Sequence, residues 1–205
     1  LPTWARAAPI QIKGDATACF GLDCSNFEDT ASTTIGGVTL SFDSNADWDF
    51  LGTTVDDVLA IQGGNGNFGT LSVSTPAVDT RVSSAFALLL TFLNPDSPSA
   101  TFQAALRGTV SSNENGGGVL VRFNPDMISG LTFYDGATGQ SGTMDVILTN
   151  NVAIASGGEA NLTGFIETQV SGSTPVPEPG SLLLLGTGLL GLVFARRVAP
   201  IVPTA

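Results

Sequence analysis

Apolar and polar residues alternate along much of the chain. In five segments an apolar residue occupies every second position, and these segments are 38–43, 101–107, 119–123, 144–149 and 162–167. In an extended segment a period of two places these side chains on one face. Each segment is therefore predicted to be a β-strand with one buried side and one solvent-facing side.

A sixth segment, residues 86–92, is apolar on both faces and is predicted to be a central strand. Turn-forming residues separate these segments, at 65–66, 94–95, 113–118, 124–125, 135–136, 150–151 and 157–158. Short strands divided by such turns predict an all-β fold, an antiparallel β-sandwich of the jelly-roll or immunoglobulin-like class. A barrel is the alternative.

The C-terminal region has a different pattern. Residues 181–195 contain no charged side chain, and Arg196 and Arg197 follow directly. As a helix this segment would span about 22 Å, which is short for a bilayer core of roughly 30 Å. One transmembrane helix is predicted over 181–197, with the arginines on the cytoplasmic side. A buried helix of a soluble domain is the alternative, which the Pro-rich segment before it disfavours.

These patterns divide the chain into parts. The exported β-sandwich domain is expected over 8–170, a Pro-rich linker over 171–180 and a cytoplasmic tail over 198–205. Residues 1–7 contain Ala5-Arg6-Ala7, a small-x-small pattern that is typical of a signal-peptidase site. They are interpreted as the remnant of a signal peptide, with an ordinary N-terminal coil as the alternative.

The composition excludes several classes of function. The net charge is −11, and the predicted domain contains only four basic residues, Lys13, Arg81, Arg107 and Arg122. Such a surface repels phosphate backbones, so nucleic acid is not an expected partner, whereas divalent cations or neutral glycans suit it.

Histidine is absent, which excludes Ser-His-Asp and Cys-His catalysis. The adjacent acids at 28–29 and 56–57 are interpreted as solvated turn residues, and no enzymatic activity is expected.

The two cysteines, Cys19 and Cys24, predict one small disulfide. In the chain-entropy model so tight a loop contributes only about 2 kcal/mol, and it therefore fixes a local turn rather than the fold. Two cysteines without histidine do not indicate a zinc site. Their spacing is not that of a C-x-x-C redox motif.

A candidate metal site lies at Asp43, Asn45 and Asp47, whose spacing is similar to the first half of a calcium loop. Trp48 stands where that loop needs glycine, and no glutamate follows at the right distance. A solvated turn is therefore favoured over a calcium site, and no other cofactor is expected. Trp48 with Phe50 is also a candidate platform for glycan stacking, although a core tryptophan is favoured.

The C-terminal motif allows a more specific interpretation. The tripeptide Pro177-Glu178-Pro179, the apolar segment 181–195 and the pair Arg196-Arg197 resemble the sorting signal of PEP-CTERM proteins. The domain is also similar to the β-rich domains of that group. The resemblance implies a bacterial protein handled by exosortase, a membrane enzyme thought to act as a cysteine transpeptidase, which would cleave near the tripeptide.

Two classes of function follow from this resemblance. The first is a non-catalytic cell-surface or extracellular matrix protein, secreted through the inner membrane and associated with exopolysaccharide and biofilm. The alternative is a carbohydrate- or calcium-binding surface module with the same sorting. The expected partners are exosortase, the lipid bilayer through residues 181–195, and exopolysaccharide.

Overall fold

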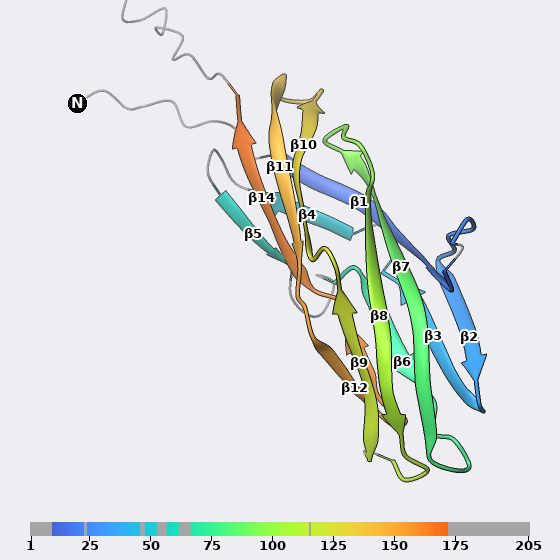
Figure 1. Cartoon of the computed structure of the whole chain (residues 1–205). Helices are drawn as coiled ribbons and strands as arrows, with labels where there is room; N and C mark the ends of the chain where they lie inside the picture. The colour runs from blue at the N-terminus through green and yellow to red at the C-terminus, as the bar shows by residue number, and fades with distance from the viewer. Residues whose placement is uncertain are drawn as a thin grey trace, which may run out of the picture. The chain divides into compact units, whose positions relative to one another are not determined.

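A computed structural model describes residues 10–22, 24–45, 48–52, 57–61, 67–114 and 116–171, with backbone alone for 49–52 and 57–61. All of them belong to one compact unit, Arg6–Gly172. They form strands and turns, with no helix among them (Figure 1). The predicted all-β class is therefore confirmed for the described residues. None of these residues forms a helix suited to crossing a membrane, and the helix predicted at 181–197 lies outside them.

The largest sheet has six antiparallel strands. Their order is β12 (Val152–Ala155), β9 (Gly117–Phe123), β8 (Ala100–Val110), β7 (Thr80–Asn94), β1 (Ile10–Phe20) and β4 (Trp48–Gly52). The segment predicted to be a central strand lies in β7, between β8 and β1. Phe86, Leu88 and Leu90 are fully buried there, and Ala87 on the other face is also buried.

Two smaller antiparallel sheets complete the described part. One has the order β10 (Met127–Asp135), β11 (Gln140–Leu148), β14 (Gly164–Val170) and β5 (Asp57–Ile61). The other has the order β13 (Glu159–Asn161), β6 (Gly69–Val73), β3 (Val38–Ser44) and β2 (Thr30–Ile35). In Figure 1 β6 and β3 lie behind β7 and β8.

The alternating segments fold as their pattern predicts. In β8 the inward residues Phe102, Ala104 and Leu106 are buried, and the residues between them are exposed. The same alternation holds in β3, β9 and β11. The segment 162–167 differs slightly, because Leu162 lies in the connection between β13 and β14 rather than in a strand. Its side chain is nevertheless buried, as the pattern predicted.

Polar side chains stabilise the predicted turns. Between β10 and β11, Asp135 accepts hydrogen bonds from the Ala137 backbone at 2.9 Å and from the Thr138 hydroxyl at 2.7 Å. Gly139 completes this turn with a φ of 70°, a conformation that glycine adopts without steric cost. This is the turn expected at Asp135-Gly136. The turn signal at 65–66 lies outside the described residues.

One aromatic core joins the sheets. Phe42 of β3 packs on Phe86 of β7 with ring centroids 5.9 Å apart, so the six-stranded sheet faces the β13-β6-β3-β2 sheet. Phe133, Val146 and Ile166 of the β10-β11-β14-β5 sheet belong to the same buried cluster. The arrangement is therefore sandwich-like, with the hydrophobic side of each sheet turned to a shared interior.

Trp48 is part of this core. It is 1% exposed, and its ring packs edge-on against Phe68 and Phe92, with centroids 5.6 Å apart in both pairs. The hypothesis that Trp48 forms a glycan platform is therefore wrong, because a ligand cannot reach its ring. The favoured interpretation as a core residue is confirmed.

Candidate functional site

Three arginines lie on the outer face of the six-stranded sheet. Strand register places Arg107 of β8 opposite Ser83, two residues along β7 from Arg81. Arg122 of β9 is opposite Ala105, two residues along β8 from Arg107. Residues that pair across strands share a face, and all three arginines are exposed. We call this diagonal row of Arg81, Arg107 and Arg122 the arginine stripe.

The stripe contains every arginine between residues 7 and 195. Diagonal neighbours on an antiparallel sheet are about 7–8 Å apart, within reach of long side chains. Among the described residues, none of the three guanidinium groups has a hydrogen bond or an ion pair with the protein. Since arginine stays protonated in proteins, this face presents positive charge on a chain whose net charge is −11.

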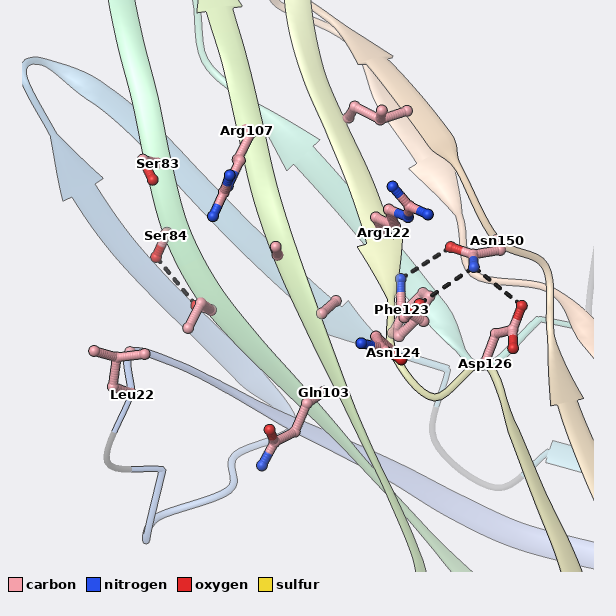
Figure 2. A pocket seen from close by; sticks show the side chains of 15 residues that line it. Leu22, Ser83, Ser84, Gln103, Arg107, Arg122, Phe123, Asn124, Asp126 and Asn150 are labelled. Atoms are coloured by element: carbon pink, nitrogen blue, oxygen red, sulfur yellow. Dashed lines mark hydrogen bonds between the residues drawn. The ribbon is translucent and has the colours of Figure 1, made fainter.

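An open groove of about 1240 Å³ runs along two of the three arginines of the stripe. Arg107 and Arg122 line it, and small residues including Ser83, Ala85 and Ala105 line it between and beside them. Figure 2 shows Arg107 between Ser83 and Arg122, with Gln103 further along β8. The small side chains leave the backbone face accessible, so that a ligand can lie flat on the strands.

Amide groups line one end of the groove. The Asn150 side chain accepts a hydrogen bond from the Phe123 backbone at 3.0 Å and donates to the Phe123 carbonyl at 3.2 Å and to Asp126 at 3.0 Å (Figure 2). These bonds fix the turn after β9. Asp126 is the one carboxylate among the lining residues that the structure describes, and its bond from Asn150 holds it at the margin of the groove.

The predicted disulfide is present beside the groove. Cys19 and Cys24 are joined, with Cα atoms 5.8 Å apart. The backbone N–H of Gly21 donates to the Ala85 carbonyl at 3.0 Å, so the loop between the cysteines is attached to β7. Leu22 in this loop is 92% exposed and lines the groove. The disulfide therefore positions one margin of the groove.

Asp79 lies two residues before Arg81, the first arginine of the stripe, in the sequence. Its carboxylate accepts hydrogen bonds from the Ser112 backbone at 2.8 Å, and from the hydroxyls of Ser112 and Ser111 at 3.2 Å each. The backbone bond is the largest cause that lowers the pKa of Asp79 below its ordinary value of 3.8, followed by the two hydroxyl bonds. Asp79 thus uses its oxygen to tie β7 to the loop after β8.

The candidate calcium residues are described only in part. Asp43 is exposed on β3, and the Asn45 amide donates to the Asn67 carbonyl at 3.0 Å. Asp47 lies outside the described residues, so the calcium hypothesis stays a prediction. Elsewhere in the described ranges no three acidic or thiol side chains gather as a metal site would require.

The arginine stripe was not found by sequence reasoning. Its members are separated by 26 and 15 residues, and no local pattern relates them. Only the pairing of β7, β8 and β9 brings them into one row. The available signal was their scarcity, because any cluster of arginines in so acidic a chain is unexpected.

Comparison with known proteins identifies one region. A family model described as the PEP-CTERM protein-sorting motif matches residues 175–197. The match covers Pro177, Glu178, Pro179, Arg196 and Arg197, the residues predicted to form the sorting signal. No curated protein and no solved structure matches the chain. The motif implies an exosortase-processed protein of the cell envelope or surface.

Proposed function

We propose that the chain is a non-catalytic protein of the bacterial cell surface or extracellular matrix, delivered by exosortase and associated with exopolysaccharide. The observation that carries this proposal is the sorting motif at residues 175–197. The Cys19–Cys24 disulfide supports it, because disulfides persist in oxidising compartments outside the cytoplasm.

The order of residues in the motif supports a defined topology. Residues 181–195 carry no charge, and the adjacent arginine pair favours the cytoplasmic side of a membrane. In this topology the β domain lies outside the inner membrane, with the segment 171–180 between them. Pro177 and Pro179 disfavour a helix there, which keeps the backbone accessible to a processing enzyme.

The shared core supports a finer assignment of the fold. We propose an antiparallel β-sandwich of the jelly-roll or immunoglobulin-like class, with the six-stranded sheet as one layer. Such sandwiches expose one face of each sheet, which suits a protein that acts through its surface. The groove on the six-stranded sheet favours the second candidate function, a carbohydrate-binding surface module.

Charge reversal at the arginine pair tests the proposed sorting. In a host with exosortase, Arg196→Glu with Arg197→Glu should reduce membrane retention of the precursor and slow its processing. The matched control is Arg196→Lys with Arg197→Lys, which preserves the charge and should behave like the unmodified chain. Cell fractionation with detection of the β domain gives the readout. Unchanged retention and processing in the glutamate variant would contradict the proposal.

A further inference from the structure

We propose that the arginine stripe and its groove bind an acidic polysaccharide, a polymer that carries carboxylates on repeated sugar units. This inference rests on the proposed function, since export would bring this face of the sheet into contact with such polymers. It adds the site, its residues and the charge of the ligand.

The distribution of charge is the first argument. The β domain predicted over residues 8–170 has four basic residues, and three of them form the stripe. Exposed like charges about 7–8 Å apart repel one another weakly, so the fold gains nothing from this row by itself. A bound anion would turn the repulsion into attraction. The guanidinium group suits carboxylates in particular, because its planar fork donates two parallel hydrogen bonds.

The length of the site is the second argument. Gln103 and Arg107 are four residues apart on β8, which is about 13 Å along a strand. Both line the groove, and Asn124 and Asn150 line it beside β9. A site of this length exceeds one small anion. Its amide groups can bond to sugar hydroxyls while the arginines bond to carboxylates.

The neighbouring side chains favour an acidic glycan over two other ligands. Phe123 is the one aromatic residue among the described residues that line the groove, and it is buried, so the described part of this face offers no ring for stacking on a neutral sugar. Single-stranded nucleic acids bind best where their bases stack on exposed aromatic rings, and none of the described residues that line the groove offers such a ring. An acidic polysaccharide offers carboxylates to the arginines and many hydroxyls to the amide groups that line the groove beside them.

Binding of polygalacturonate to the purified full chain in neutral detergent tests the proposal. Calorimetry at low salt should detect binding, and raising the salt should weaken it because the contacts are ionic. Dextran, an uncharged glucan, should not bind. Arg107→Gln and Arg122→Gln should each weaken binding about tenfold, as expected for loss of a charge-assisted hydrogen bond. Lys13→Gln is the matched control, because it removes one charge outside the stripe and should have little effect.

A further variant separates loss of binding from loss of folding. Ala105 is exposed between the arginines and faces Arg122, so Ala105→Glu introduces an internal competitor without removing a core side chain. It should weaken polygalacturonate binding while the circular dichroism spectrum stays unchanged. The proposal is overturned if polygalacturonate does not bind, if dextran binds equally, or if Lys13→Gln weakens binding as much as the arginine variants. Stripe-dependent binding of duplex DNA without binding of polygalacturonate would also overturn it. None of these results depends on sorting by exosortase.

Discussion

Replacing Trp48 with alanine should destabilise the β domain strongly. Trp48 is the largest fully buried side chain in the described part of the protein, and it packs edge-on against two phenylalanine rings. Truncation of a buried aromatic residue to alanine typically costs 3–5 kcal/mol, which includes the cavity that remains. We therefore expect a loss of about 4 kcal/mol and, for a protein of this size, a melting temperature lower by about 8–16 °C.

Urea unfolding of the full chain followed by circular dichroism measures this loss without relying on tryptophan fluorescence. The matched control is Tyr134→Ala, an aromatic truncation at a side chain that is 55% exposed. It should cost less than about 1 kcal/mol, as surface substitutions usually do. A loss below about 1 kcal/mol for Trp48→Ala would refute the described core packing and reopen the surface interpretation of this residue.

Three further predictions concern the cysteines and the acids. Mass spectrometry of the oxidised protein should show a Cys19–Cys24 disulfide, and its reduction should lower the free energy of unfolding by about 2 kcal/mol. Carbon-detected NMR titration should give Asp79 a pKa below 3.8. The hydrogen bonds to its carboxylate then stabilise the fold above pH 3.8, and this contribution is lost as the pH falls through the lowered pKa. A pKa at or above 3.8 would refute this prediction. Calcium should leave the melting temperature unchanged, because tryptophan occupies the glycine position of the loop; a rise that Asp43→Ala with Asp47→Ala removes would show a site.

The strands that the sequence predicts are those whose inward positions carry large apolar residues. In β8 and β9 the period of two is visible because buried phenylalanine, leucine and valine alternate with polar or exposed residues. The disulfide could also be predicted from a short stretch of sequence, because its two cysteines are only five residues apart. Features set by local spacing are thus readable from the chain alone.

Two long strands escaped prediction for identifiable reasons. In β1 the inward positions include Gly14 and Ala16, which give no hydrophobic signal. A Cβ atom on Gly14 would lie 2.2 Å from the Trp48 ring, so the small residue is required by a partner distant in sequence. In β10 a register shift between Ile128 and Leu131 breaks the alternation, and Gly130 adopts a φ of 73° there.

The arginine stripe depends entirely on strand register. A shift of one residue between β7 and β8 would move Arg107 out of line with Ser83 and disperse the row. Register is set by the whole core, so residue types and local spacing could not reveal this surface. The sorting motif is the opposite case, because its function lies in a contiguous segment of the chain.

Mapping of the C-terminal peptide in the exported protein tests the central claim most directly. In a host with exosortase, mass spectrometry should find that the exported form ends near residues 176–180 and lacks the apolar segment 181–195. In the same host without exosortase, the full-length chain should remain in the inner membrane. Recovery of intact Arg196-Arg197 in protein outside the cell would contradict the account, because the C-terminal segment would then not be a processed sorting signal.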